Sequence, residues 1–294
     1  MATTLPRTGY APVNGLQMYY EVLGTPIADV PPLLVLHGAL GTLDMFGPLL
    51  PQLAQTRQVI AVEQQGHGRT ADTDRPLTYE QMADDTAAFL GFLGVDQVDV
   101  FGFSMGGGIA WQLVIRHPEL VRKLVTGSST YTRAHGYVEA MGDLAQTFTP
   151  AMFAGTPIEA GYKAVAPHPE EFSTLVRKVQ QLTMESTDIP VEVIQGIAAP
   201  TMVIIGDADI IRPEGAAELF RLLGGGVPGD YVGLPAARLA VLPGTTHMTA
   251  LTRTRWLRSM ITEFLDAPMP EGLQSPGGPL GLIGAGAGDG DIPW

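Results

Sequence analysis

The sequence contains no cysteine among its 294 residues. This absence excludes disulfide bonds, metal sites built from thiolates and a cysteine nucleophile. Basic residues are also scarce, with 17 lysines and arginines against 30 acidic residues and a formal net charge of −13. Because a surface of that sign repels phosphate backbones, we expect no nucleic-acid partner. No apolar run approaches the roughly 20 residues that a membrane-spanning helix needs, so we expect no membrane association.

The composition is that of a folded protein. Hydrophobic residues make up 45% of the chain and charged residues 16%, which excludes global disorder. The length suits one large α/β domain. The first ten residues lack the basic and then apolar segments of a secretory signal peptide, which favours a cytoplasmic protein. The sequence does not specify an oligomeric state.

Short apolar runs bounded by turn-forming residues indicate buried strands. The dipeptide Asn14-Gly15 accepts the positive φ angles of a tight turn, so it predicts a hairpin between Tyr10–Val13 and Leu16–Val22. The later runs are nearly continuous in hydrophobicity, as in strands of a mostly parallel sheet that are buried on both faces. These runs are Leu33–Leu36, Val59–Val62, Val98–Phe101, Val121–Val125, Met202–Ile205 and Leu239–Leu242.

Helical patterns lie between several of these runs, and the alternation predicts a doubly wound α/β fold. The predicted helices are Tyr79–Leu93, Met105–Arg116, Glu214–Leu223 and Trp256–Leu265.

Residues 130–198 interrupt the alternation, because they contain helical patterns and no strand-like run. We interpret them as a helical cap inserted into a core made of residues 1–129 and 199–266. The patterns in the cap are Tyr137–Phe148, Pro157–Val165 and Pro169–Met184. Residues 267–294 are rich in glycine and proline and predict a mobile C-terminal tail.

The strongest chemical signal is the segment Gly102-Phe-Ser-Met-Gly106, which lies between a predicted strand and a predicted helix. A sharp strand-to-helix turn there strains the serine backbone and presents the hydroxyl above the edge of the sheet. The flanking glycines remove side chains that would clash. The alternative is a glycine-rich turn that happens to hold a serine. The context favours Ser104 as a nucleophile.

A serine hydroxyl needs a base, and the base needs an acid that orients it. His247 follows the last predicted strand, at the edge of the sheet that faces Ser104. Asp207 and Asp209 follow the predicted strand Met202–Ile205. Because the loop must first turn away from the strand, we expect Asp209 to be the acid and Asp207 to be a structural hydrogen-bond acceptor.

An acyl-transfer reaction also needs two backbone N–H donors for the developing oxyanion. Met105 follows the nucleophile directly and supplies one. The second is predicted at Ala39, in the loop after the strand Leu33–Leu36, with Leu40 as the alternative. We interpret His37 as a support for this loop rather than a catalyst.

Apolar side chains near this loop and in the cap are candidates for the wall of a substrate pocket, although packing within the cap is the alternative interpretation. The candidates are Leu40, Met45, Phe46, Met141, Phe148, Phe153 and Tyr162. Serine chemistry of this kind requires no metal and no organic cofactor, and we expect neither. The expected partner is a small-molecule ester or lactone.

The chain resembles the α/β-hydrolase family from about Tyr10 to Asp266. This resemblance implies a sheet of about eight strands, a helical cap inserted after the sixth strand, and a triad in the order Ser104, Asp209, His247. The matching motifs, in order, are His37-Gly38, Gly66-His-Gly68, Gly102-Phe-Ser-Met-Gly106, Gly206-Asp-Ala-Asp209 and Pro243-Gly-Thr-Thr-His247. Because position 104 is serine, the branches with an aspartate nucleophile are disfavoured.

A narrower similarity points to bacterial esterases that include macrolide esterases, which open the lactone of large-ring antibiotics. The similar stretches are Ala11–Gly15, Met18–Glu21, Phe46–Pro51, Asp74–Leu77 and Tyr79–Asp85. The resemblance therefore implies a serine esterase that cleaves its substrate through an acyl-enzyme, with macrolide hydrolysis and antibiotic resistance as the specific hypothesis. A general carboxylesterase, a cofactor-free perhydrolase or haloperoxidase, and a ligand receptor with little turnover stay open. The perhydrolase group shares the Phe-Ser-Met-Gly-Gly-Gly stretch but carries Trp-Pro where this chain has Ala39-Leu40.

Overall fold

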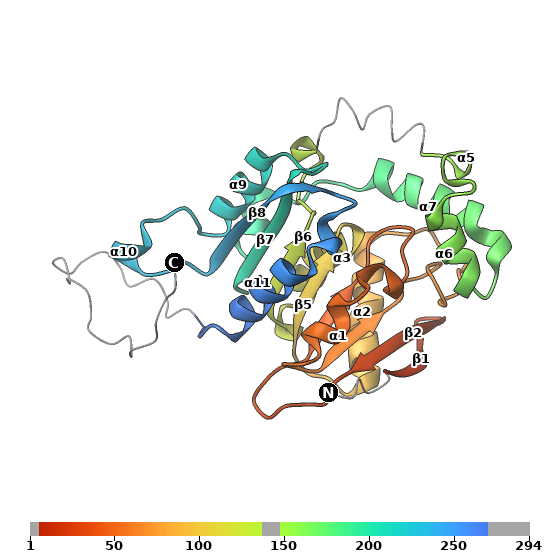
Figure 1. The fold of residues 1–294 in the computed structure, drawn as a ribbon, viewed down its shortest axis with the longest axis horizontal. Coiled ribbons are helices and arrows are strands. Elements are labelled where there is room, and N and C mark those ends of the chain that lie inside the picture. The colour runs from red at the N-terminus through yellow and green to blue at the C-terminus, as the bar shows by residue number, and fades with distance from the viewer. Residues whose placement is uncertain (1–5, 137–147, 270–294) are drawn as a thin grey trace.

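The computed structural model describes residues 6–136 and 148–269 of the chain. Its centre is a twisted sheet of eight strands in the order β1-β2-β4-β3-β5-β6-β7-β8 (Figure 1). The pairs β1–β2 and β2–β4 are antiparallel, and every later pair is parallel. The strands are β1 (Arg7–Val13), β2 (Leu16–Leu23), β3 (Leu33–Leu36), β4 (Val59–Val62), β5 (Val98–Phe103), β6 (Val121–Gly127), β7 (Thr201–Ala208) and β8 (Ala237–Thr246). The predicted α/β-hydrolase fold with a mostly parallel eight-stranded sheet is confirmed.

The sheet begins with the predicted hairpin. Asn14 and Gly15 have φ angles of 48° and 84°, and Val13 pairs with Leu16 across the turn. A two-residue turn of this kind requires positive φ at both positions, which asparagine and glycine accept. The hairpin forms one edge of the sheet, and the parallel strands β3, β5, β6 and β7 lie in the middle of the sheet.

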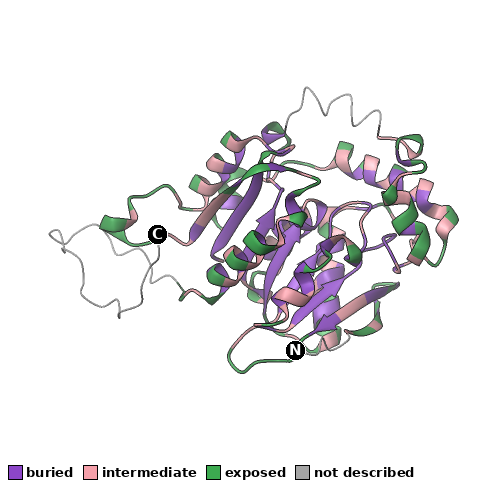
Figure 2. Ribbon diagram, viewed as in Figure 1, coloured by how far each residue is buried: buried purple, intermediate pink, exposed green. Residues whose placement is uncertain are grey.

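Helices cover both faces of the sheet because successive strand residues point to opposite sides. Along β3, Leu34 and Leu36 pack with α2, α3 and α9, whereas Leu33 and Val35 pack with α1 and α11. The strands are accordingly the most buried part of the molecule (Figure 2). The helices are α1 (Leu49–Leu53), α2 (Tyr79–Leu93), α3 (Met105–Arg116), α9 (Pro213–Leu222) and α11 (Thr254–Asp266).

In the described part of residues 130–198 the regular elements are helices, apart from one isolated bridge between Gly136 and Ile211. They are η3 (Arg133–His135), α5 (Pro150–Phe153), α6 (Pro157–Val165), η4 (Pro169–Glu171), α7 (Phe172–Glu185) and α8 (Val191–Gln195). Figure 1 shows α5, α6 and α7 grouped to one side of the sheet. The cap boundaries stay a prediction. Most of the predicted helix Tyr137–Phe148 and most of the predicted tail lie outside the described residues.

Four short helices complete the list of elements: η1 (Leu43–Phe46), η2 (Pro118–Leu120), α10 (Gly229–Val232) and η5 (Ala250–Thr252). None of the helices within residues 6–136 and 148–269 combines the length and apolarity that a membrane span requires.

A buried ion cluster ties the amino-terminal ends of the parallel strands together. The carboxylate of Asp99 on β5 accepts hydrogen bonds from Arg57 at 2.8 Å and from Arg122 at 2.6 and 2.8 Å. The side chains of Arg57 and Asp99 have no exposed surface. Arg57 also pairs with Asp266 at the end of α11, so the cluster joins the sheet to its last helix.

We expect Asp99→Asn to lower the free energy of unfolding by about 3 kcal/mol or more, because it removes the buried negative charge that Arg57 and Arg122 share. Urea denaturation of the two proteins measures this. The control is Asp84→Asn, which breaks a pair between half-exposed Asp84 and Arg116 and should cost less than about 1 kcal/mol. Equal losses in the two variants would contradict the interpretation.

Candidate active site

Ser104 lies at the turn between β5 and α3 with φ 54° and ψ −116°, a conformation that side-chain-bearing residues rarely adopt. Its neighbours make the turn possible. A Cβ on Gly102 would lie 2.2 Å from the carbonyl oxygen of Gly106, and a Cβ on Gly106 would lie 2.2 Å from the carbonyl oxygen of Leu36. Only glycine at both positions lets strand and helix approach this closely, and the approach presents the Ser104 hydroxyl.

The three residues predicted as a triad are hydrogen-bonded in sequence. Nε2 of His247 lies 3.0 Å from Oγ of Ser104, and Nδ1 of His247 lies 2.9 Å from Oδ1 of Asp209. His247 comes from the loop after β8, and Asp209 from the loop after β7. The ring of Phe103 packs on the imidazole, with 5.2 Å between ring centres. A hydroxyl, an imidazole and a carboxylate in this order can transfer a proton from the serine to the histidine.

The carboxylate of Asp209 is buried and held by several donors. The hydroxyl of Ser128 donates to its Oδ2 at 2.5 Å, and the N–H groups of Gly206 and Ile210 donate at 3.2 and 2.7 Å. Burial alone would raise the pKa of Asp209, but the hydrogen bonds from His247 and Ser128 outweigh it and lower the pKa below its usual range. Asp209 is therefore held as a carboxylate facing the imidazole.

Asp207 has a different role, because its carboxylate accepts the N–H groups of Gly244 and Thr245 at 2.9 and 3.0 Å. It fixes the loop that carries His247. This is the structural role that the sequence predicted for it.

The loop after β3 brings its N–H groups to the same edge as Ser104. Within the described residues, neither the N–H of Ala39 nor that of Met105 donates to a protein group. The two residues line one pocket together with Ser104. The Cβ that Gly38 lacks would lie 3.4 Å from the Cβ of Ser104, so the loop passes close to the serine. Both N–H groups are available to an oxyanion.

Two buried histidines, His37 and His67, support the loop after β3. Nδ1 of His37 donates to the carbonyl of Gly38 at 2.8 Å, and its Nε2 accepts the N–H of Gln64 at 3.0 Å. The ring of His67 packs 5.0 Å from that of His37. Burial lowers the pKa of His37 to about 4 and that of His67 to about 3, and the neighbouring His37 also lowers the pKa of His67. Both rings therefore stay neutral in the folded protein near neutral pH.

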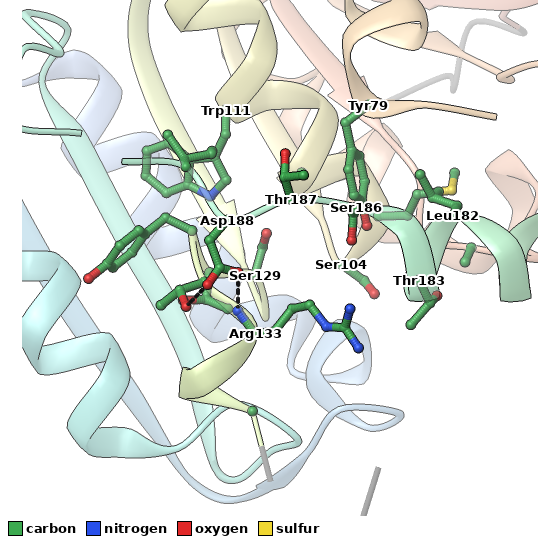
Figure 3. Close-up of a pocket in the computed structure, with 18 of the residues that line it drawn as sticks. Tyr79, Ser104, Trp111, Ser129, Arg133, Leu182, Thr183, Ser186, Thr187 and Asp188 are labelled. Atoms are coloured by element: carbon green, nitrogen blue, oxygen red, sulfur yellow. Dashed lines mark hydrogen bonds between the residues drawn. The ribbon is translucent and has the colours of Figure 1, made fainter. Parts of the chain in front are cut away.

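A pocket of about 690 Å³ opens beside Ser104. Figure 3 shows residues of its wall, drawn from the start of α2, the start of α3, the segment after β6 and the end of α7. Apolar side chains such as Leu77, Leu182 and Ile211 line part of it, and hydroxyl-bearing side chains line much of the rest. The volume is that of a site for a drug-sized molecule, for which roughly 300–1,000 Å³ is usual.

The predicted pocket wall and the observed one differ. Leu40 and Phe46 lie in the core with 4% and 1% of their surface exposed. Met45 lies against the oxyanion loop, where its sulfur accepts the N–H of Gly38 at 3.3 Å. None of these three side chains lines the pocket that contains Ser104. Met45 instead supports the loop that carries Ala39.

The predicted aromatic residues of the cap also lie elsewhere. Phe148 packs on Phe153 with 4.7 Å between ring centres, and Phe153 and Tyr162 both pack on Phe172. They form the interior of the cap and are not among the residues that line this pocket. Their role in substrate binding stays a prediction. Met141 lies outside the described residues.

Sequence reasoning missed several residues of the site. Ser128, which donates to Asp209, lies in the loop after β6. Tyr79 and Ser129 on the pocket wall were also missed. The run Gly106-Gly-Gly108 indicates that side chains can approach this helix closely, but only the fold shows that Ser129 is one of them.

Within residues 6–136 and 148–269, no group of His, Asp and Glu side chains could hold a metal ion.

The fold and this geometry define a hydrolase of the α/β type. The family model described as "alpha/beta hydrolase fold" matches residues 31–188, which is more than half of the chain. The chain therefore belongs to the α/β-hydrolase family.

Individual relatives are more distant. The chain is 31% identical over 142 residues to the sn-1-specific diacylglycerol lipase ABHD11 of Danio rerio, a match that covers 46% of this chain and 43% of that one. The chain thus spans less than half the length of the curated relatives it matches.

Solved structures match over nearly the whole fold but at low identity. The meta-cleavage product hydrolase CumD of Pseudomonas fluorescens IP01 superposes with a TM-score of 0.68 at 20% identity, covering 89% of this chain and 98% of that one. The enol-lactonase of Burkholderia xenovorans LB400 gives 0.66 at 21% identity, covering 88% and 100%. At such identity these neighbours establish the fold alone.

The neutral buried histidines generate a prediction about stability and pH. In the unfolded chain each histidine binds a proton below about pH 6.5, whereas the folded protein keeps both rings neutral down to about pH 4 for His37 and about pH 3 for His67. Their contribution to stability is complete above pH 6.5 and is lost as the pH falls. Each should add about 1.4 kcal/mol per pH unit to the slope of unfolding free energy in that window.

Urea denaturation between about pH 6 and pH 4.5 measures this slope. In His67→Asn, the amide can replace the Nδ1 donor that bonds the carbonyl of Gln65, but it does not titrate. The slope should fall by about one proton's contribution. An unchanged slope would show that His67 does not stay neutral in the folded state.

Proposed function

We propose that this protein hydrolyses carboxylic esters through an acyl-enzyme formed on Ser104. The observation that carries the proposal is the hydrogen-bonded chain from Ser104 through His247 to Asp209, placed at the wall of a pocket. A strained serine whose hydroxyl is hydrogen-bonded to an imidazole nitrogen needs no metal or organic cofactor to attack a carbonyl carbon. The free N–H groups of Ala39 and Met105 complete the set of groups that acyl transfer requires.

The proposed reaction has two halves. In the first, His247 accepts the hydroxyl proton as Oγ of Ser104 attacks the ester carbonyl, and the N–H groups of Ala39 and Met105 bind the oxyanion. The protonated His247 then gives its proton to the leaving alcohol, and Asp209 stabilises the imidazolium meanwhile. In the second half, water deprotonated by His247 attacks the acyl-enzyme and releases the acid.

The names of relatives support this class of reaction. The Danio rerio relative is named as a diacylglycerol lipase, and one structural neighbour is named as an enol-lactonase. For this chain we propose, within that class, the lactone ester of large-ring macrolides as the specific substrate. The support is the similarity to bacterial macrolide esterases, together with a pocket whose volume of about 690 Å³ suits a drug-sized ligand.

Mass spectrometry of small molecules incubated with the protein tests the proposal. The panel contains short acyl esters and large-ring macrolides, and Ser104→Ala is the control. A macrolide that gains one water only with intact Ser104 would support the specific substrate, and turnover of simple esters alone would leave a general carboxylesterase. Turnover that depends on added peroxide would favour a perhydrolase. Saturable binding without product would favour a ligand receptor and contradict the proposed hydrolysis.

The contact between Ser128 and Asp209 generates a further prediction. Ser128→Ala removes one donor from the carboxylate, so the pKa of Asp209 should rise and the carboxylate that orients His247 should be less firmly positioned. We expect ester turnover (kcat) to fall by roughly ten-fold, and the acidic limb of the pH–rate profile to move to higher pH. Thr130→Val is a neighbouring control, because the Thr130 hydroxyl bonds His135 and not the triad. A profile in Ser128→Ala that keeps its shape would contradict the assignment.

A further inference from the structure

The hydroxyl groups on the pocket wall fall into two sets. Most are already used within the protein: Ser128 donates to Asp209, Tyr131 to Glu218, Thr132 to Asp188 and Thr183 to the carbonyl of Val179, while Thr130 bonds His135. By contrast, the side-chain hydroxyls of Tyr79, Ser129, Ser186 and Thr187 have no hydrogen-bonding partner within the residues that the structure describes. Ser186 and Thr187 lie just past the end of α7, whereas Tyr79 and Ser129 pack against the helix that follows Ser104.

The side chains of Tyr79 and Ser129 lie against the first turn of α3. A Cβ on Gly107 would lie 2.7 Å from Oγ of Ser129, and a Cβ on Gly108 would lie 2.4 Å from Cε1 of Tyr79. Alanine at either position would therefore displace the neighbour. The glycines that follow the nucleophile make the room in which Tyr79 and Ser129 lie.

Helical geometry places this room next to the nucleophile. Gly107 and Gly108 follow Ser104 by three and four positions, so all three lie on one face of the first turn of α3. Figure 3 shows Tyr79, Ser129 and Ser104 around the same space. The two hydroxyls thus flank the place where the carbonyl group of an ester would be attacked.

Both groups are able to donate and accept hydrogen bonds. Burial raises the pKa of Tyr79 to about 12, with the Glu80 carboxylate as a smaller cause, so its phenol keeps its proton. Ser129 is only 7% exposed. An alkyl chain in this part of the pocket would displace water from both hydroxyls and replace none of its hydrogen bonds, which is unfavourable. A chain that carries oxygen would restore them.

The position of His247 indicates which part of the ester meets these hydroxyls. The leaving alcohol must reach Nε2 of His247 to take its proton, whereas the acyl group stays bonded to Oγ of Ser104. Ser104 lines the same pocket as Tyr79 and Ser129, so we place the acyl group in that pocket.

From these contacts we infer that Tyr79 and Ser129 form a polar acyl subsite, which selects esters whose acyl chain carries an ether, hydroxyl or keto oxygen near the scissile carbonyl. The inference rests on the proposed ester hydrolysis and adds the class of acyl group. A polyoxygenated lactone belongs to this class, and a plain fatty acyl chain does not.

The test uses substrates of equal length. In p-nitrophenyl pentanoate, replacement of one methylene by oxygen gives the 2-ethoxyacetate or the 3-methoxypropanoate. Each kcat/KM is divided by the rate constant for hydroxide-catalysed hydrolysis of the same ester, which removes the electronic effect of the oxygen. We expect the better oxygen-containing ester to be preferred over pentanoate by about ten-fold, the value for one or two neutral hydrogen bonds.

Variants locate the preference in the structure. Tyr79→Phe and Ser129→Ala should each lower the preference by about three-fold, and the double variant should bring it close to one. Thr183→Val is the matched control, because its hydroxyl also lines the pocket but bonds the carbonyl of Val179. This variant should keep the preference.

Two results would overturn the inference: Ser104-dependent turnover of all three esters at similar corrected rates, or a preference that survives in the double variant. Either leaves the proposed esterase function standing. Calorimetry of the same esters with Ser104→Ala measures their binding affinities in the absence of turnover. If the wild-type protein hydrolyses none of them but Ser104→Ala binds the oxygen-containing ester more tightly, the proposed function fails and the subsite stands. Equal binding, or none, in that case overturns both.

Discussion

The close approach of α3 to the ends of β3 and β5 is the constraint on which the rest of the site depends. At Gly106 the helix backbone comes so near the carbonyl of Leu36 that no side chain has room. This contact brings the N–H of Met105 and the loop with Ala39 to one edge of the sheet, and it fixes Ser104 in a strained turn above them. Strain of this kind persists only where the surrounding structure enforces it. Here the enforcement comes from the close contacts that Gly102 and Gly106 permit.

Three buried polar side chains around this edge, His37, Glu63 and Asp209, each make two or more hydrogen bonds. His37 bonds two backbone groups, Asp209 accepts four hydrogen bonds, and Glu63 accepts the N–H groups of Leu43 and Arg69. A buried polar group without partners would cost stability, so each pairing also fixes a position. The cap differs, because its aromatic residues pack on one another. Rigid polar contacts thus hold the groups proposed for chemistry, while apolar packing shapes the cap beside them.

The sequence predicted what depends on local patterns. Near-continuous apolar runs predicted the strands, and the bounds of α2 and α3 agree with their periodicity. The glycine spacing around Ser104 and the strand preceding Asp209 were sufficient to select residues that the fold brings within hydrogen-bonding distance. The pocket wall could not be obtained in this way. Whether an aromatic side chain such as Phe153 faces a cavity or Phe172 depends on packing between helices far apart in sequence, which periodicity does not encode. Ser128 was missed because a hydroxyl in a loop carries no pattern of its own.

The glycine run after the nucleophile contributes both to the backbone fold, which local patterns predict, and to the pocket wall, which depends on packing. Gly106 is required by backbone contacts within the sheet edge, which makes it part of the fold. The nearest atoms to a Cβ on Gly107 and Gly108 would belong to the side chains of Ser129 and Tyr79, so the approach of helix to sheet explains only part of their small size. A helix tolerates glycine in its first turn at a cost of roughly 1 kcal/mol each relative to alanine. The two consecutive glycines have this cost, but they leave space beside the Ser104 hydroxyl. The same turn therefore presents the Ser104 hydroxyl and makes room for two further hydroxyls, which we propose select the acyl group that Ser104 attacks.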